Sequence, residues 1–432
     1  MSQPKFLQIH TLTSYPATLL NRDDAGFAKR LPFGGATRTR VSSQCLKYHW
    51  RNFNGENALH DMDEFETTYR SRETFQRKLA KPLIDDGYPA PLVRAGTGAL
   101  KEFLLSGKKI KKGDIEKLID PSKGDDKYDP WKELETSQIT IFGEPEMRFL
   151  RDLLKSKIDE LKDEYSDFWG EDAVTDKEIV SGAAEDLSDF AKGDLKKNLK
   201  GLQSASGLDA AMFGRMVTSD ILARGDAAIH VAHSFTTHEE ESESDYFSAV
   251  DELRRDEPEE SGELGAGHIN STELSSGLFY NYVVVDIPLL VSNLQAVERS
   301  DWEHTDKSMA AEVVKRLIHL VATVSPGAKL GSTAPYSYAQ CMFVEAGNSQ
   351  PRTLANAFQK PVSKNSQSVL LNSYQALADF VEDMDGMYGP TTERRLAATG
   401  PKEILLEKLG VHELSSVPDI SEWASNQIKG EK

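Results

Sequence analysis

Residues 277–287 read GLFYNYVVVDI and carry the strongest strand signal in the 432-residue chain. β-Branched and aromatic side chains fill this stretch, and both kinds favour extended backbone. Towards the C-terminus, 309–321 has apolar residues at helical spacing, 340–345 is a further strand candidate, and 368–384 predicts a helix. In the tail from residue 401 we expect one short helix.

Towards the N-terminus, a polar tongue over 234–275 is too hydrophilic to form a core, and it predicts a projecting hairpin or a long loop. Residues 55–205 are charged and helix-prone, and 144–165 carries an apolar stripe about four turns long. Two short strands are expected at 6–12 and 37–41, with a loop between them. This order of elements predicts an α+β domain with an antiparallel sheet and large excursions.

The chain is acidic overall, with a formal net charge of −18 and a pI near 5.1, which by itself argues against nucleic-acid binding. The charge is unevenly distributed, however. Residues 239–263 contain twelve acidic and two basic residues, whereas 22–51 contain seven basic and two acidic residues. Because screening confines each field to about 8–10 Å, the N-terminal segment can still present a positive stripe.

No apolar stretch approaches the roughly 18–20 residues that a membrane-spanning helix needs. The opening MSQPKFLQIH lacks the basic start and apolar run of a signal peptide. We therefore expect a cytoplasmic protein with no membrane partner. Cys45 and Cys341 are too few for a disulfide framework or a four-cysteine zinc site. We expect both to be plain apolar side chains, and we expect no metal and no cofactor.

Residues 40–51, RVSSQCLKYHWR, form the most informative cluster. Ser42 or Ser43 can cap a helix, and Lys47 and Arg51 share one face of it at a spacing of i, i+4. A helix N-terminus presents unsatisfied N–H groups and the positive end of the dipole, which favours anions. The cluster therefore predicts a cradle for consecutive phosphates, with a capped surface helix bearing solvated charges as the alternative. The candidate cradle comprises Arg40, Ser42, Gln44, Lys47 and Arg51.

The stretch LLNRDD offers a second candidate, because Arg22 can hold a phosphate. Asp23 and Asp24 can bind a metal, or they can pair with neighbouring arginines. The histidines are scattered along the chain, and neither a phosphate-binding P-loop nor a nucleophile elbow occurs. These patterns give no support to a catalytic role.

The stretch MFGRM, which ends at Met216, contains side chains that are usually core residues. Arg215 and Met216 can instead present a cation and an apolar wedge to an extended nucleic-acid strand. In the tongue, Phe247 and Ile269 stand among charged residues, and they can wedge between bases or dock on a neighbouring subunit. Sequence alone leaves these alternatives open.

Nine stretches occur in a fixed order between about residues 5 and 360: FLQIHTL, LLNRDD, FGG, RTRVSSQCLK, FGRM, HVAHSFTTH, YFSAVDEL, INSTELSSGLFY and SPGAK. Each is weak alone, but together they are specific. In these stretches the chain resembles the CasC family, the Cascade backbone subunit of type I-E CRISPR systems. It departs from the family in having fewer cations on the helix, a longer and more acidic tongue, and a poorly matching C-terminal region.

The resemblance implies an RRM-like (ferredoxin-like) palm with a helical fingers insertion and a thumb hairpin. It further implies a helical filament of several copies along a guide crRNA, which is kinked, with a base flipped out, at each thumb. The guide bases then pair with a target DNA strand, and other Cascade subunits are further partners. The implied ranges are 1–54, 206–233 and 277–432 for the palm and C-terminal helices, 55–205 for the fingers and 234–276 for the thumb.

The resemblance assigns guide-backbone contacts to five positions that the residue chemistry also selects, Arg22, Ser42, Gln44, Lys47 and Arg51. Met216 matches a methionine that stacks against bases. Phe247, Ser248 and Ile269 match thumb positions that wedge at the flipped base.

We therefore predict a structural RNA-binding protein with no catalysis of its own. One alternative is a metal-dependent ribonuclease that uses Asp23 or Asp24, because related backbone proteins of type III systems cleave RNA with a loop aspartate. Another is a protein-only scaffold that assembles without RNA.

Overall fold

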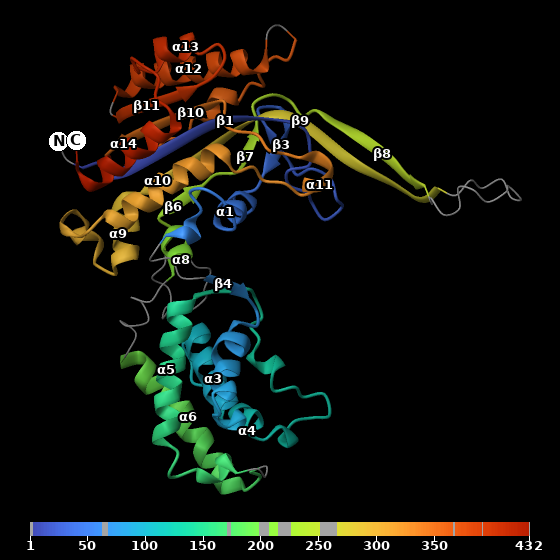
Figure 1. Ribbon diagram of the computed structural model, residues 1–432, viewed down its shortest axis with the longest axis vertical. Coiled ribbons are helices and arrows are strands. Elements are labelled where there is room, and N and C mark those ends of the chain that lie inside the picture. Colours follow the sequence, from blue (N-terminus) through green and yellow to red (C-terminus); the bar gives the residue numbers. More distant parts are fainter. Residues whose placement is uncertain are drawn as a thin grey trace, which may run out of the picture. The chain divides into compact units, whose positions relative to one another are not determined.

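The computed structural model describes residues 3–62, 68–170, 174–197, 207–214, 226–250, 266–365, 368–390 and 392–431. The chain forms two compact units (Figure 1). The first comprises Met1–Asp61, His230–Ile287 and Lys307–Lys432, and the second comprises Met62–Ile229 and Pro288–Asp306. The predicted palm, fingers and thumb ranges stay a prediction. Residues 207–214, predicted as palm, lie in the second unit.

An antiparallel sheet forms the centre of the first unit, with the strand order β11-β10-β1-β9-β7-β3-β2. Strand β1 lies in the middle and pairs with β9 on one side and β10 on the other. Strands β6 and β8 also pair with β9. The predicted α+β class with an antiparallel sheet is confirmed. The strands are β1 (Phe6–Thr18), β2 (Arg30–Phe33), β3 (Ala36–Val41), β6 (Ile229–Val231), β7 (Ser234–Thr236), β8 (Ser242–Val250), β9 (Ala266–Asp286), β10 (Cys341–Gly347) and β11 (Thr392–Ala398).

The strands predicted at 6–12, 37–41, 277–287 and 340–345 are confirmed by β1, β3, β9 and β10. The prediction that the tongue contributes nothing to the core is wrong at its start. Strand β7 is part of the sheet, and Phe235 is 7% exposed within an apolar cluster of the first unit. Beyond β7, strands β8 and β9 pair as a hairpin, and residues 251–265, which connect them, lie outside the described residues.

Helices cover both faces of this sheet (Figure 1). On one face, Leu12, Tyr280 and Phe343 pack with α12 and α13 in a single apolar cluster. On the other face, α1 and α10 pack against β1 and β9, and α14 packs on α10. The helix predicted at 368–384 is confirmed by α12, but the tail holds two helices instead of one. These helices are α1 (Ser43–Arg51), α10 (Ser308–Thr323), α11 (Leu330–Thr333), α12 (Val369–Tyr388), α13 (Glu403–Lys408) and α14 (Val417–Lys429).

The second unit is mainly helical, as the sequence predicts for 55–205. Its core is one apolar cluster that includes Leu100, Leu118 and Leu154. Gly96 permits the close approach of α3 and α5, because a Cβ there would lie 2.3 Å from Leu154 Cδ1. The elements of this unit are β4 (Thr68–Ser71), α2 (Lys81–Asp85), α3 (Ala90–Ser106), α4 (Lys112–Ile119), β5 (Thr140–Gly143), α5 (Glu144–Glu160), α6 (Lys177–Lys197), α8 (Leu208–Phe213) and α9 (Ile287–Gln295).

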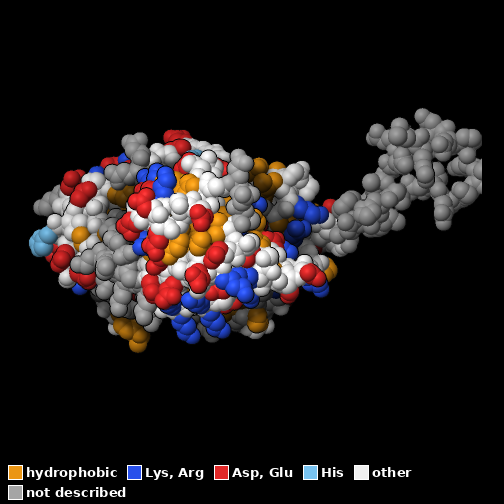
Figure 2. All heavy atoms as spheres, turned by 90° about the horizontal axis from the view of Figure 1, so that it is seen from below, with side chains coloured by type: hydrophobic (Ala, Val, Ile, Leu, Met, Phe, Trp, Pro, Cys, Tyr) orange, Lys and Arg blue, Asp and Glu red, His pale blue; other side chains and the backbone are white. Residues whose placement is uncertain are grey.

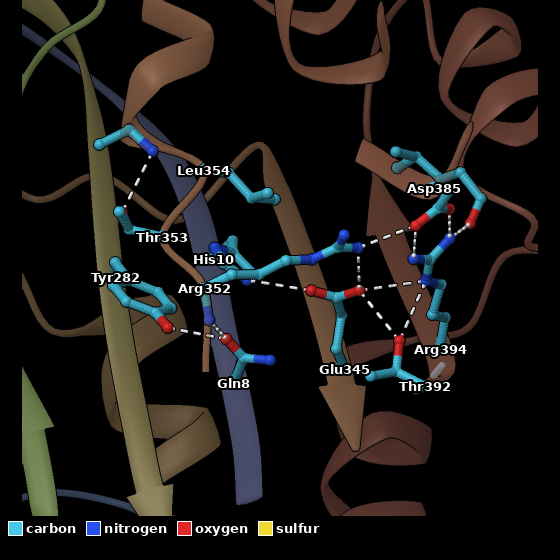
Figure 3. A network of polar contacts seen from close by, with 12 residues as sticks. Gln8, His10, Tyr282, Glu345, Arg352, Thr353, Leu354, Asp385, Thr392 and Arg394 are labelled. Carbon is cyan, nitrogen blue, oxygen red and sulfur yellow. Dashed lines mark hydrogen bonds and ion pairs between the residues drawn. The ribbon is translucent and has the colours of Figure 1, made fainter. Parts of the chain in front are cut away.

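A buried charge network ties β1, β10, β11 and α12 together (Figure 3). Glu345 is fully buried, and one of its oxygens accepts hydrogen bonds from Arg394 Nε at 3.1 Å and Arg352 Nη2 at 3.3 Å. Its other oxygen lies 3.6 Å from His10 Nε2. Asp385 binds both arginines, with Arg394 Nη2 at 2.8 Å and Arg352 Nη2 at 3.0 Å. The positive charges of the two arginines thus balance the negative charges of the two carboxylates. Such pairing is needed because an ionised group is costly to bury without a partner of opposite charge.

Stability of this fold should decrease as the pH falls. Burial by itself would raise the pKa of Glu345, but the hydrogen bond and charge of His10 and the charges of Arg394 and Arg352 lower it from 4.5 to about 2. Burial lowers the pKa of His10 below 6.5, against the opposing effect of Glu345. Each group binds protons more readily in the unfolded chain. The stability from His10 is therefore present above about pH 6.5 and that from Glu345 above about pH 4.5, and both are lost as the pH falls towards the folded-state values.

Urea unfolding between pH 8 and pH 4 checks this expectation. The free energy of unfolding should decline below about pH 6.5 and decline further below about pH 4.5. A His10→Gln variant should show a weaker decline in the upper range, because it no longer takes up a proton there on unfolding. A free energy of unfolding that rises on acidification contradicts the account.

Candidate nucleic-acid interface

Helix α1 is fixed to the sheet by two apolar side chains one turn apart. Leu46 and Trp50 are 6% and 1% exposed, and both line a cavity of about 20 Å³ with residues of β1, β9 and α10. The N-cap is Ser42, whose hydroxyl oxygen accepts a hydrogen bond from Cys45 N–H at 3.3 Å. The helix predicted to begin at Ser42 or Ser43 is therefore confirmed, with Ser42 as the cap.

The remaining surface of α1 carries the predicted cradle residues. Gln44 is exposed and Lys47 and Arg51 are half-buried, and Arg51 Nε donates to the Lys47 carbonyl at 3.1 Å. In the described part of the chain, no acceptor engages the backbone N–H groups of Ser43 and Gln44. The first turn thus offers amide donors on the same helix as two cations, which suits an anion.

Loop 19–29 is attached directly to the N-terminus of α1. Asn21 Oδ1 accepts from Ser42 N–H at 3.0 Å, and the Asn21 carbonyl accepts from Lys29 N–H at 2.9 Å. The predicted residue Arg22 is exposed in this loop and forms a backbone bridge to Ala28. The structure therefore joins the LLNRDD stretch and the helix start, which were separate candidates in the sequence.

Asp23 holds the shape of this loop. One of its carboxylate oxygens accepts from Ala25 N–H at 3.0 Å and from Phe27 N–H at 2.9 Å. These bonds give Asp23 a structural role of the kind that aspartate commonly has in turns. In the part of the chain that the structure describes, no three His, Cys, Asp or Glu side chains are grouped so that they can hold a metal ion.

A buried carboxylate anchors the other end of the loop. Glu273 of β9 is 8% exposed, and its Oε2 accepts from Ala28 N–H at 2.7 Å. Its Oε1 accepts from Arg30 Nη2, while Arg30 Nε donates to Glu240. Glu273 was not a predicted site residue, because an acidic side chain in a polar tongue gave no signal for binding an anion.

Arg40 lies at the end of β3, two residues before the cap. Its Nε donates to the Arg30 carbonyl at 3.1 Å, and its Nη1 lies 3.2 Å from His233 Nδ1. Because a guanidinium only donates, Nδ1 must accept, and the imidazole is then neutral. Burial, together with the charges of Arg40 and Lys29, lowers the pKa of His233, which agrees with this assignment.

The predicted positive stripe is narrower than the sequence suggests. Arg38 is fully buried and donates to the carbonyls of Thr236 and Phe358 at 2.9 Å, so it cannot face a ligand. Arg30 is paired with two glutamates. Figure 2 shows a different view, from below in the orientation of Figure 1, and on that face acidic and basic side chains are intermingled.

The remaining predicted residues are not brought into this cluster by the described contacts. Ser248 and Ile269 are directly paired across β8 and β9, and Phe247 is paired with Asn270. Arg215 and Met216 lie outside the described residues. Across the described ranges, each helix is too short or too polar to cross a membrane.

Comparison with known proteins adds a family and a fold. A search of curated proteins finds no match. One solved structure, "CRISPR RNA-guided surveillance complex, pre-nicking", has a chain that is 23% identical, with a TM-score of 0.69 over 98% of this chain and 100% of that chain. A chain of a second, "CRISPR RNA-guided surveillance complex", is 20% identical, with a TM-score of 0.62 over 97% and 99%. Both likenesses show a shared fold.

The family assignment rests on the sequence itself. The model of the CT1975-like protein family matches residues 7–423, which is almost the whole chain. The match spans the strands and helices of both units as well as loop 19–29 and α1. The chain belongs to the CT1975-like protein family of CRISPR-associated proteins.

Proposed function

We propose that this chain is the guide-binding backbone subunit of a type I-E CRISPR surveillance complex. In this proposal, several copies polymerise along a crRNA in the cytoplasm, together with other Cascade subunits. Each copy holds the sugar–phosphate backbone and leaves the bases available to a target DNA strand. Family membership and a fold shared with chains of RNA-guided surveillance complexes support the proposal.

The observation that carries the proposal is the joined cluster of α1 and loop 19–29. The first-turn amides, Lys47 and Arg51 lie on one short helix, and Asn21 connects that helix to the loop bearing Arg22. Amide donors and cations recognise phosphates without reading bases. A guide held in this way keeps its sequence information for base pairing.

The proposal includes no catalytic step for this chain. Asp23, one of the two candidate aspartates of the metal-dependent ribonuclease alternative, accepts hydrogen bonds from two backbone amides of its own loop. From the family resemblance we also propose an RRM-like palm, with Met216, Phe247, Ser248 and Ile269 at a flipped guide base. Incubation of the assembled protein with complementary RNA and Mg²⁺ tests the absence of cleavage, and regularly spaced cuts would favour the ribonuclease.

Charge reversal on α1 tests the proposal directly. The Lys47→Glu/Arg51→Glu double variant should weaken RNA binding by about 100-fold or more, because each lost charge-assisted contact is worth about 1.5–3 kcal/mol. The loss should be equal for unrelated guide sequences. The slope of log K against log salt should fall by about 1.4, which corresponds to two phosphates on a single strand. Fluorescence anisotropy with labelled guides measures both quantities.

A matched control reverses two lysines elsewhere in the first unit. Lys360 and Lys402 adjoin elements that cover the opposite face of the sheet, η7 (Ala355–Phe358) and α13. The Lys360→Glu/Lys402→Glu variant adds the same negative charge and should leave the salt slope nearly unchanged. Equal losses in both double variants indicate a general charge effect and contradict the assignment to α1.

Glu273 gives a second test, in which the direction of the change in RNA affinity decides between two explanations. Glu273→Ala removes a negative charge, so simple electrostatics predicts tighter RNA binding. We expect weaker binding, by about 3- to 10-fold, because loop 19–29 loses its anchor and must be ordered on binding. Faster hydrogen exchange of the Ala28 amide should accompany the loss. The control Glu243→Ala, at an exposed position on β8, should bind RNA as tightly as wild type or more tightly.

A further inference from the structure

Two of the most exposed aromatic side chains described in the chain stand two residues apart. Tyr336 and Tyr338 are 73% and 72% exposed, in the segment that connects α11 to β10. Pro335 before them is buried, and Ser337 between them is half-buried. Exposed and less exposed positions thus alternate along the segment, so both tyrosine rings are presented to solvent while Pro335 and Ser337 are turned towards the protein.

The backbone of this segment is held firmly in place. Ser337 N–H donates to Ser325 Oγ at 3.0 Å, and Ser325 Oγ donates to the Ser337 carbonyl at 3.0 Å. Ala339 N–H donates to the Ala322 carbonyl at 2.8 Å. Two exposed rings on a fixed backbone lose little conformational entropy when they bind a flat partner.

A strained residue sets the direction of the pair. Ala334 has a φ of +38°, in the left-handed region that residues with a Cβ rarely adopt, and its carbonyl accepts from Tyr336 N–H at 2.7 Å. Such strain persists only where surrounding contacts enforce it, often at ligand-binding sites. Here it turns the chain immediately before the two tyrosines.

The loop before α11, which Ser325 joins to the segment bearing the two tyrosines, is attached to the proposed guide-binding elements. Gly327 N–H lies 3.4 Å from His49 Nε2 of α1, and Ala328 N–H donates to the Leu19 carbonyl at 2.9 Å. Lys329 is the only charged residue between residues 324 and 340 in a chain with a net charge of −18. A polyanion can therefore approach the two rings without meeting acidic side chains of this segment.

We propose that Tyr336 and Tyr338 form a stacking platform for unpaired bases of a single-stranded nucleic acid. This inference rests on the proposed function and adds a base-contacting element to a surface otherwise described by phosphate contacts. Stacking on aromatic rings tolerates every base, because every base has a π-face. Among the described residues 330–340, Leu330 is the only other exposed large apolar side chain, so the two rings are not part of the wide apolar core that a stable protein interface has.

This platform is tested by combining substitution of the two tyrosines with removal of the bases from the bound strand. The full-length wild type and Tyr336→Ala/Tyr338→Ala are titrated with a uridine oligonucleotide and with an abasic ribose-phosphate oligonucleotide of equal length. The double variant should lose about 10-fold or more in affinity for the uridine strand and almost nothing for the abasic strand. Its salt slope should match the wild type, because no phosphate contact is removed. Tyr336→Phe/Tyr338→Phe should restore binding, whereas Tyr336→Leu/Tyr338→Leu should not.

A second arm identifies the strand. Protein already loaded with a guide is titrated with a non-complementary thymidine oligodeoxynucleotide and with its abasic counterpart. A loss of affinity that requires bases in the RNA titration assigns the platform to the guide. The same base-dependent loss seen only in the DNA titration assigns the platform to a DNA strand. Equal losses on uridine and abasic strands, or rescue by the leucine variant, overturn the platform and indicate a contact between protein copies. Failure of the wild type to bind RNA at all overturns the proposed function itself.

Discussion

Glu345→Ala should lower the free energy of unfolding of the first unit by about 3–5 kcal/mol, the usual cost of removing one partner from a buried ion pair. Glu345 is fully buried and receives hydrogen bonds from Arg394, Arg352 and Thr392. Without it, Arg394, whose side chain is 5% exposed, keeps only Asp385 as an ionic partner among the described residues. The substitution leaves a buried positive charge with half of its compensation, which is why the expected effect is large.

Urea unfolding at pH 7.5 measures this loss, with Glu382→Ala as the control. Glu382 lies on the same helix as Asp385 and pairs with Lys408, but its side chain is 57% exposed. An exposed pair of this kind contributes about 0–1 kcal/mol, so the control should unfold nearly as wild type does. Glu345→Gln should fall between the two, since the amide oxygen still accepts hydrogen bonds. A Glu345→Ala variant as stable as the control shows that the network does not hold the sheet together.

Trp50→Ala should destabilise the first unit by a similar amount, about 3–5 kcal/mol, because it removes a large buried side chain and leaves a cavity. Trp50 is 1% exposed and already lines the small cavity beneath α1, so the space left by the indole adds to it. A helix of nine residues is not stable by itself in water and depends on such packing. RNA binding should therefore be lost along with stability, although Trp50 is buried and cannot contact RNA itself.

Tyr48→Ala supplies the control on the same helix. Tyr48 is 56% exposed, and its removal leaves the packing of α1 on the sheet intact. Hydrogen exchange should show faster exchange across residues 43–51 in Trp50→Ala and wild-type rates in Tyr48→Ala. Normal protection of α1 in Trp50→Ala would contradict the view that the apolar pair positions the cradle.

Strands β1, β3, β9 and β10 of the central sheet could be predicted from the sequence, because β1 and β9 contain many β-branched and aromatic residues and β10 contains a short apolar run. Strand β11 could not, because its sequence TERRLAA looks like a charged surface segment. One of its charged residues, Arg394, can be buried because Glu345 and Asp385 balance its positive charge, and these partners lie on other elements. Strand β7 could not be predicted either, because three residues next to an acidic run are too few to show a periodic pattern.

The candidate interface was predictable only in part. Short-range patterns identified the cap, the basic face of α1 and Arg22. The residues that fix their positions, Asn21 and Glu273, act through contacts with partners 21 and 245 positions away in the chain. Arg38 shows the opposite error. The sequence counted it in the positive stripe, but its side chain is buried and donates to backbone carbonyls.

The most direct test is a structure of this protein assembled on a crRNA. The account predicts guide phosphates within hydrogen-bonding distance of the Ser43 and Gln44 amides and of the Lys47 and Arg51 side chains, at the same place in every copy. A guide that runs across another surface, with α1 facing solvent, would contradict it.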